Sequence, residues 1–210
     1  MPLTLQTYTV GPLMENAYLL VDEDSSRAVL IDPGDEPERL LYALESQALT
    51  LSAIWLTHAH FDHIGAIDGI LAKYTVPVLL HPEDKPLYSN AYKAAQLWEI
   101  PFVQPSAATV DIEDKQVLTL GNTNVHCLFT PGHAPGHIAF YLPEQQLLIA
   151  GDALFQGSIG RTDLPMGNHE QLIESIKTRL LVLPDDTDVY PGHGEATTIG
   201  AEKSYNPFLS

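Results

Sequence analysis

The heptapeptide Thr-His-Ala-His-Phe-Asp-His at residues 57–63 constrains this chain more than any other feature, because it packs three imidazoles and one carboxylate together. Burying such a cluster is costly, and its histidines repel one another when protonated, unless a bound cation holds them neutral. Neutral imidazole nitrogens and carboxylate oxygens are the ligands that suit zinc and similar divalent ions. The heptapeptide therefore predicts a metal site.

Single histidines and one aspartate further along the chain extend the set of candidate ligands. A lone histidine is more often a surface or core residue, and an aspartate after a strand is often a helix cap. These interpretations fit the heptapeptide poorly, because four such side chains lie within six positions. Seven ligands are too many for one tetrahedral ion and about right for two. The seven candidates are His58, His60, Asp62, His63, His133, Asp152 and His193.

The candidate ligands follow predicted strands. Four short apolar runs predict strands, and a candidate ligand comes within four residues of the end of each. Loops at the carboxyl ends of strands converge, so four ligands at four strand ends indicate one site at one edge of the sheets. The pairs are residues 52–56 with His58, 124–129 with His133, 146–150 with Asp152, and 188–190 with His193.

Further short apolar runs predict strands at 3–10, 17–21, 28–31, 76–80 and 138–142. Helices are predicted at 36–47, 64–74, 82–98 and about 200–205, and a capping box of Asn168 and Gln171 predicts another at 168–181. Two sheets covered by outer helices would accommodate the number of predicted elements.

The spacing of the ligands divides them between two ions. Residues 58 and 60 can point to one side of a strand exit, whereas 62 and 63 follow a turn and can face a neighbouring position. Two ions about 3.5–4 Å apart can share a hydroxide. Zinc lowers the pKa of its bound water to about 7, so that this hydroxide exists at neutral pH. We therefore expect two divalent ions, with zinc as the first expectation and iron or manganese as alternatives. One ion would take His58, His60 and His133, the other Asp62, His63 and His193, with Asp152 as the bridge.

Charge and hydropathy limit the partners that we expect. The formal net charge is −17, and the sequence contains no basic cluster that would attract nucleic acid or an anionic membrane. Hydrophobic residues make up 45% of the chain, as in ordinary globular proteins, and no apolar run approaches the roughly 20 residues that span a bilayer. A small-molecule substrate is therefore the expected partner.

Residues 1–6 have no positive region before an apolar core, so no secretory signal is predicted. The one cysteine, Cys127, excludes an intramolecular disulfide and is interpreted as a core residue. We therefore expect a cytoplasmic protein, a monomer or a weak homo-oligomer, with residues 1–210 forming a single domain.

At the candidate ligands the chain resembles the metallo-β-lactamase superfamily. The resemblance implies an α/β fold, a four-layer αββα sandwich with its metal site at the edge of the two sheets. It covers most of the chain, and the motifs occur in the expected order. They are Asn-Ala-Tyr at 16–18, Ile-Asp-Pro-Gly at 31–34, the heptapeptide at 57–63, Pro-Gly-His at 131–133, Gly-Asp at 151–152 and Pro-Gly-His at 191–193.

Within that superfamily the chain looks most like the hydroxyacylglutathione hydrolase, or glyoxalase II, branch. The branch implies hydrolysis of glutathione thioesters such as S-lactoylglutathione by a metal-bridging hydroxide, with Asp62 helping to orient it. Long enzymes of this branch carry a C-terminal helical domain that helps to bind glutathione. Only residues 194–210 follow His193, so the resemblance is to the short form without that domain.

The loop Gly-Arg-Thr-Asp-Leu-Pro at residues 160–165 departs from the glyoxalase II pattern. Arg161 matches a basic position of the family, whereas Asp163 stands where a substrate-contacting tyrosine is expected. Both are candidate substrate-binding residues, although an Arg161–Asp163 salt bridge that only holds the loop is an equal alternative. Asp32 is interpreted as orienting a ligand histidine or as a turn residue, and His137 as a supporting or structural residue.

The same loop is similar to that of persulfide dioxygenases, in which a single iron is held at the positions of His58, His133 and Asp152. Two histidines and one carboxylate suit iron(II) and oxygen chemistry. A mononuclear iron dioxygenase is therefore the alternative enzyme, and a non-catalytic scaffold with a vestigial metal site is a second alternative. A β-lactamase is disfavoured, because Asp152 replaces the cysteine or serine often found there.

Overall fold

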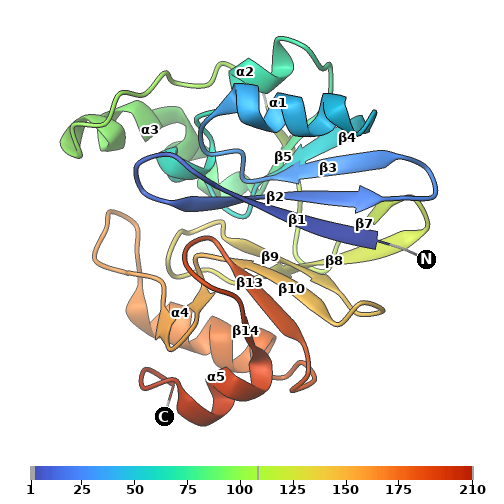
Figure 1. Ribbon diagram of the computed structural model, residues 1–210. Helices are drawn as coiled ribbons and strands as arrows, with labels where there is room; N and C mark the ends of the chain where they lie inside the picture. Colours follow the sequence, from blue (N-terminus) through green and yellow to red (C-terminus); the bar gives the residue numbers. More distant parts are fainter. Residues whose placement is uncertain (1–2, 108, 210) are drawn as a thin grey trace.

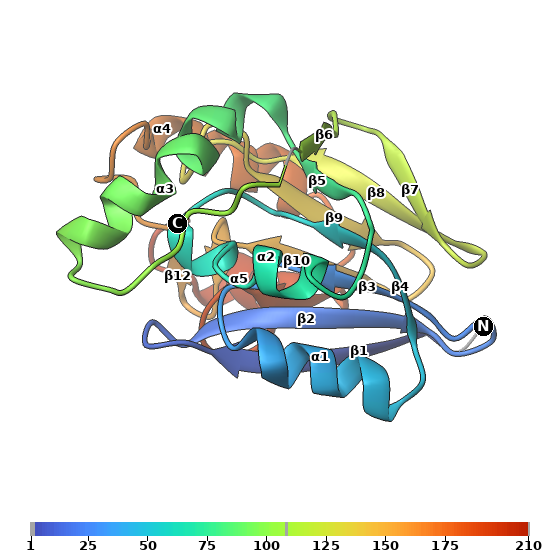
Figure 2. The ribbon, with the colours of Figure 1, turned by 90° about the horizontal axis from the view of Figure 1, so that it is seen from above.

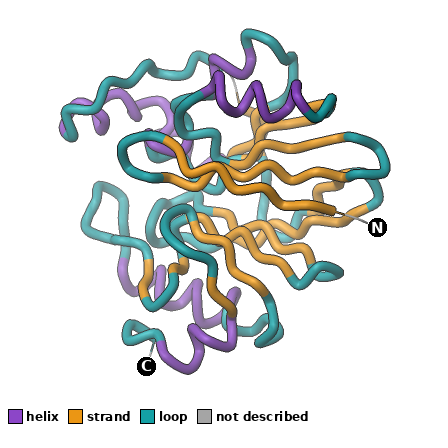
Figure 3. Tube along the Cα trace, viewed as in Figure 1, coloured by secondary structure: helices purple, strands orange, loops and turns teal. Residues whose placement is uncertain are grey.

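Two six-stranded sheets lie face to face at the centre of the computed structural model, which describes residues 3–107 and 109–209 (Figures 1 and 3). Residues 1 and 2, on which part of the signal-peptide prediction falls, are outside this range. The first sheet contains, in spatial order, β1 (Leu3–Val10), β2 (Glu15–Asp22), β3 (Arg27–Ile31), β4 (Thr50–Trp55), β5 (Val78–Leu80) and β6 (Thr109–Asp111). The second contains β14 (Thr197–Thr198), β13 (Asp188–Pro191), β10 (Leu147–Gly151), β9 (Ile138–Leu142), β8 (Thr123–Phe129) and β7 (Val117–Leu120).

The sheets mix parallel and antiparallel pairs. Strands β1, β2 and β3 are antiparallel neighbours, whereas β3, β4, β5 and β6 run parallel to one another. In the second sheet β10 is parallel to β13, and the other pairs are antiparallel. A small hairpin, β11 (Leu154–Phe155) with β12 (Ser158–Ile159), follows β10.

Helices cover the outer face of each sheet (Figures 1 and 2). Helices α1 (Pro37–Ser46), α2 (Ile67–Leu71) and α3 (Lys85–Leu97) lie over the first sheet. Helices α4 (His169–Ser175) and α5 (Ile199–Tyr205) lie over the second. This helix–sheet–sheet–helix order confirms the four-layer αββα sandwich predicted from the sequence.

The apolar residues form three cores, because successive side chains of a strand point to opposite faces. In β2, Leu19 packs under the helices of the first layer, whereas Leu20 packs between the two sheets. In β10, Leu148 packs under α4 and α5, whereas Ile149 joins the core between the sheets. Both faces of these strands are buried, and this fixes the register of the sheets and the place where each strand ends.

The predicted helix at residues 64–74 is much shorter in the structure. A 3-10 turn (Phe61–His63) is followed by α2, which covers only Ile67–Leu71. A tertiary contact replaces the first helical turn: the backbone N–H of Ala66 donates to the Pro33 carbonyl at 3.0 Å, and Gly65 lies so close to Gly34 that an added Cβ would come 2.4 Å from its carbonyl oxygen. The predicted helix at 168–181 is α-helical only to Ser175 and continues as a π-helix (Ile176–Leu180). Strands β6, β7, β11, β12 and β14 were not predicted.

Within the described residues, every helix is too short or too polar to cross a membrane.

Only the N-cap half of the capping box predicted at Asn168 is present. The Asn168 side-chain oxygen accepts a hydrogen bond of 3.1 Å from the backbone N–H of Gln171, whereas the Asn168 backbone N–H donates to the Gly132 carbonyl at 2.7 Å. We expect Asn168→Ala to lower the free energy of unfolding by about 1 kcal/mol, since one helical N–H loses its partner. Urea denaturation measures the change. Asn168→Ser restores a capping oxygen and should recover most of the loss, so an equal loss in both variants would contradict the capping role.

Candidate metal centre

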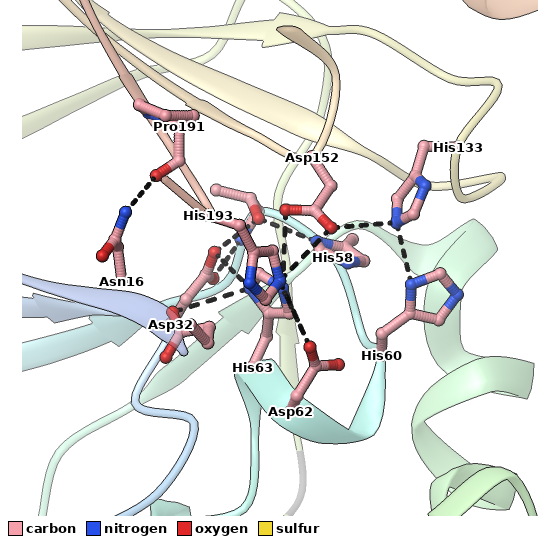
Figure 4. A network of polar contacts seen from close by, with 12 residues as sticks. Asn16, Asp32, His58, His60, Asp62, His63, His133, Asp152, Pro191 and His193 are labelled. Atoms are coloured by element: carbon pink, nitrogen blue, oxygen red, sulfur yellow. Dashed lines mark hydrogen bonds and ion pairs between the residues drawn. The ribbon is translucent and has the colours of Figure 1, made fainter. Parts of the chain in front are cut away.

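The loops after β4, β8, β10 and β13 bring the seven candidate ligands together at one edge of the two sheets (Figure 4). His58 and His60 follow β4, and Asp62 and His63 belong to the 3-10 turn that comes next. The remaining three ligands follow one strand each of the second sheet. The sequence predicted this convergence from strand ends alone.

The atoms of six candidate ligands form two groups, each with its atoms within 4.8 Å of one another, and a third such group, Asp32, His58 and His63, joins the two. The first group is His58, His60 and His133, in which the His60 Nδ1 and His133 Nε2 atoms face each other at 2.9 Å. The second is Asp62, His63 and His193, in which Asp62 Oδ2 lies 3.3 Å from His193 Nε2. The grouping matches the division expected from the spacing, and the role of these residues as ligands stays a prediction.

Asp152 lies between the two groups. Its Oδ2 atom is 3.4 Å from His133 Nε2 in the first group and 3.7 Å from His193 Nε2 in the second. Its Oδ1 atom is 3.6 Å from His63 Nε2. A carboxylate with one oxygen toward each group has the placement that a bridging ligand requires.

The centre fits cations, because several of its polar atoms are buried without a hydrogen-bond partner among the described residues. These atoms are His58 Nε2, His63 Nε2 and Asp152 Oδ1. A buried polar atom without a partner costs about 1–3 kcal/mol, so three in one place indicate that another group satisfies them. Imidazole nitrogens and carboxylate oxygens are the donor set of zinc, iron and manganese sites.

Hydrogen bonds fix four of the ligand rings in the orientation that a metal needs. In each ring the Nδ1–H donates to a nearby oxygen, which leaves Nε2 facing the centre as the atom available to a cation. The acceptors are Thr57 Oγ1 for His58 (2.9 Å), Asp32 Oδ2 for His63 (3.1 Å), the Arg161 carbonyl for His133 (2.8 Å) and the Leu13 carbonyl for His193 (3.1 Å).

Asp32 connects the two groups of ligands. Its Oδ1 accepts from the Thr57 backbone N–H at 2.7 Å, and its Oδ2 accepts from the Thr57 hydroxyl at 2.5 Å and from His63. Because the Thr57 hydroxyl donates to Asp32, it accepts from the ring N–H of His58. The buried Asp32 carboxylate therefore orients a histidine of each group, which confirms the orienting role considered from the sequence.

Burial and neighbouring charges divide the histidines electrostatically. Burial and, to a lesser extent, the neighbouring His133 lower the pKa of His60 to about 3. Burial and the nearby histidines hold the pKa of His58 well below its usual range. At His63 burial also opposes the charged form, but the Asp152 and Asp62 carboxylates outweigh it and raise the pKa. The first group is therefore a set of neutral imidazoles, whereas the histidines of the second group lie beside the carboxylates of Asp62 and Asp152.

Two carboxylates beside the centre were not identified from the sequence. Asp84 is buried and accepts hydrogen bonds from the backbone N–H groups of Ala59, at 2.8 Å, and Gly136. It thus holds the loop between His58 and His60, and burial raises its pKa to about 7. Glu15 is also buried, with Oε1 3.7 Å from His63 Nδ1. Neither residue has a local sequence signal, because their contacts join distant segments.

His137 supports the bridging aspartate. Its Nε2 accepts a hydrogen bond of 3.1 Å from the Asp152 backbone N–H, and its Nδ1–H donates to Thr130 Oγ1 at 2.8 Å. The ring is buried and stacks on His58 with the two ring centres 5.3 Å apart. His137 is therefore a positioning residue, in agreement with the supporting role considered from the sequence.

Arg161 and Asp163 form a bidentate salt bridge, with nitrogen–oxygen distances of 2.7 and 2.8 Å. The Arg161 guanidinium also lies over the Trp98 ring, 5.6 Å from its centre. The pair therefore holds the loop at 160–165, whose Arg161 carbonyl anchors His133. Contact of either side chain with a substrate stays a prediction.

The family model described as the metallo-beta-lactamase superfamily matches residues 10–193, which include all seven candidate ligands. The chain belongs to the metallo-beta-lactamase superfamily. Among its relatives in the superfamily, the probable metallo-hydrolase YqgX of Bacillus subtilis (strain 168) is 42% identical over 203 residues, covering 96% of this chain and 95% of the relative. Hydroxyacylglutathione hydrolase GloC of Haemophilus influenzae is 39% identical over 210 residues, or 99% of each chain.

Solved structures of superfamily members superimpose closely on this chain. A di-iron-bound form of TTHA1623 is 46% identical with a TM-score of 0.90, covering 97% of this chain and all of that one. The B3 metallo-beta-lactamase BLEG-1 is 40% identical with a TM-score of 0.92, covering 99% and 100%. ETHE1 from Myxococcus xanthus is 30% identical with a TM-score of 0.81, covering 97% and 83%.

We expect Asp32→Asn to weaken metal binding by about 10–100-fold, because the amide removes the negative charge and one of the acceptors that orient His58 and His63. Competition with a chromophoric chelator measures the affinity. Asp24→Asn, in the exposed turn between β2 and β3, is the matched control and should bind metal as the unaltered protein does. Equal affinities in all three proteins would show that Asp32 has no part in orienting the ligands.

Proposed function

We propose that the chain is a metal-dependent hydrolase of thioesters, and of glutathione thioesters such as S-lactoylglutathione in particular. The observation that carries the proposal is the pair of ligand groups with Asp152 between them, beside a cavity that gives a substrate access. The 39% identity to a hydroxyacylglutathione hydrolase over nearly the full length of both chains supports the choice of substrate class.

The residues of the centre would hold two cations and keep the ligand rings oriented toward them. His58, His60 and His133 would hold one cation, while His63, His193 and Asp62 would hold the other. Two bound divalent ions supply Lewis acidity and lower the pKa of water to about 7. The hydrogen bonds from the Nδ1 atoms of the ligand histidines keep their free nitrogens aimed at the centre throughout.

Asp62 is placed to handle the attacking water, because it lines the cavity as well as the metal centre. Its carboxylate accepts a proton from the water and orients the oxygen toward the thioester carbonyl carbon. A carbon–oxygen bond forms and the carbon–sulfur bond breaks. One water proton ends on the thiol, the other is lost from the carboxylic acid, and the electron pair of the broken bond stays on sulfur.

A mononuclear iron persulfide dioxygenase is the second candidate function. His58, His133 and Asp152 form a two-histidine, one-carboxylate set, and the chain is 30% identical to the ETHE1 structure. The higher identity to hydroxyacylglutathione hydrolase GloC, 39% over nearly the whole chain, favours the hydrolase. A vestigial scaffold is disfavoured, because a lost metal site would not keep buried nitrogens without partners.

The test of the proposed function is hydrolysis of S-lactoylglutathione by zinc-loaded protein. We expect a kcat/KM of about 10⁴ M⁻¹s⁻¹ or more, which is the lower end of the usual enzyme range. Asp62→Asn should reduce kcat by at least about 100-fold, because it removes the proton acceptor. Arg39→Gln, at an exposed salt bridge, is the control and should leave kcat unchanged.

The rival activities are measured on the same preparations. Oxygen uptake on glutathione persulfide by the iron-loaded protein, with negligible thioester hydrolysis in any metal form, would replace the hydrolase by the dioxygenase. If the protein hydrolysed a penicillin faster than every thioester, the thioester assignment would be overturned. Only the broader assignment as a metallohydrolase would remain.

A further inference from the structure

A cavity of about 580 Å³ opens directly onto the metal centre. Its inner end is formed by His60, Asp62, His133, Asp152 and His193, which are the polar groups that would face a reacting carbonyl. The volume lies within the range of about 300–1,000 Å³ that ligand pockets occupy. The cavity therefore has room for much more of a substrate than the reacting bond.

The two walls of the cavity are apolar. One wall is a face of α3 and its carboxyl end, where side chains three and four positions apart lie on the same side. The other is the segment that runs from β11 through the loop at 160–165. The side chains that carry this inference are Ala91, Ala94 and Trp98 on the first wall, and Phe155, Ile159 and Leu164 on the second.

The cationic side chains that line the cavity already have hydrogen-bond partners, so they offer little to a strongly polar substrate group. Within the described residues these cations are Lys93 and Arg161. The Arg161 guanidinium is occupied by Asp163 through two hydrogen bonds, and the Lys93 ammonium donates to Asn90 Oδ1 at 2.7 Å. A polar chain between the two walls would lose its hydrogen bonds to water without replacement, and this loss opposes binding.

The apolar surface continues outward beyond the cavity. Leu97 and Trp98, at the end of α3, both line the cavity and are exposed to 85% and 45%. Exposed apolar side chains beside an apolar pocket are typical of a binding surface. A chain longer than the cavity would stay in contact with these two residues.

We propose that the cavity binds an extended apolar chain of the substrate, and that in a thioester this chain is the acyl group. The assignment to the acyl group rests on the proposed thioester hydrolysis. With the carbonyl at the metal end, the chain lies between α3 and the segment that contains Phe155 and Ile159. A lactoyl group is small and hydroxylated, and would leave most of both walls without contact. Medium-chain acyl thioesters are therefore the better substrates.

Binding of S-alkylglutathiones tests the proposal without turnover, because their thioether bond cannot be hydrolysed. The series runs from methyl to octyl, and isothermal titration of the zinc-loaded protein measures each affinity. Each methylene that is buried should tighten binding about fourfold. An affinity that stays constant along the series would overturn the proposal.

A charged side chain in the wall provides the matched comparison. Ala94→Glu places a carboxylate in the apolar wall, whereas Gln96→Glu places one on the same helix at an exposed position that does not line the cavity. We expect the first variant to lose the dependence on chain length and the second to keep it. Equal dependence in both variants would show that the chain does not bind along this wall.

Hydrolysis of acylglutathiones from acetyl to octanoyl, with S-lactoylglutathione for comparison, separates this inference from the proposed function. A kcat/KM that rises with chain length supports both. A kcat/KM that is highest for lactoylglutathione and falls with chain length overturns the apolar acyl group and leaves the thioesterase intact. If no thioester is cleaved, the proposed function fails and the acyl assignment fails with it, while the S-alkyl series alone decides whether the cavity binds an apolar chain.

Discussion

The buried carboxylate of Asp32 is the interaction on which the centre depends most. It receives hydrogen bonds from the Thr57 backbone, the Thr57 hydroxyl and the His63 ring, and through Thr57 it also fixes His58. Asp32 itself adopts a left-handed backbone conformation, with φ of 49°. A side chain with a branched Cβ would be strained there, so both the conformation and the charge limit what can replace it.

This network gathers carboxyl groups in the interior, where Glu15, Asp32 and Asp152 are all buried. Burial holds the pKa of Glu15 well above its usual range, and a buried carboxylate charge is costly in general. Bound cations would offset that cost, and metal binding would then contribute to the stability of the fold as well as to its chemistry. The bridging candidate Asp152 directly follows β10, which is buried along its whole length between the two layers that it separates.

The sequence predicted the parts of this structure that depend on local pattern or on residue type. The alternation of apolar residues predicted most strands of the sheets to within two residues, and the spacing of the histidines predicted the two ligand groups. The extent of α2 was predicted wrongly, because the contact between Gly65 and Gly34 is tertiary. The positions of Asp84 and Glu15 were not predicted, because Asp84 acts on Gly136, 52 residues further along the chain. The apolar walls of the cavity likewise come from two separate segments that only the fold brings together.

The number of ions bound per chain tests the central claim most directly. Native mass spectrometry of protein saturated with zinc and then freed of excess metal counts them. We expect two ions in the unaltered protein and one in His60→Ala and in His193→Ala, because each variant lacks one of three ligands in only one group. A single ion in the unaltered protein that both variants keep would contradict the two-ion centre and would fit the set of His58, His133 and Asp152.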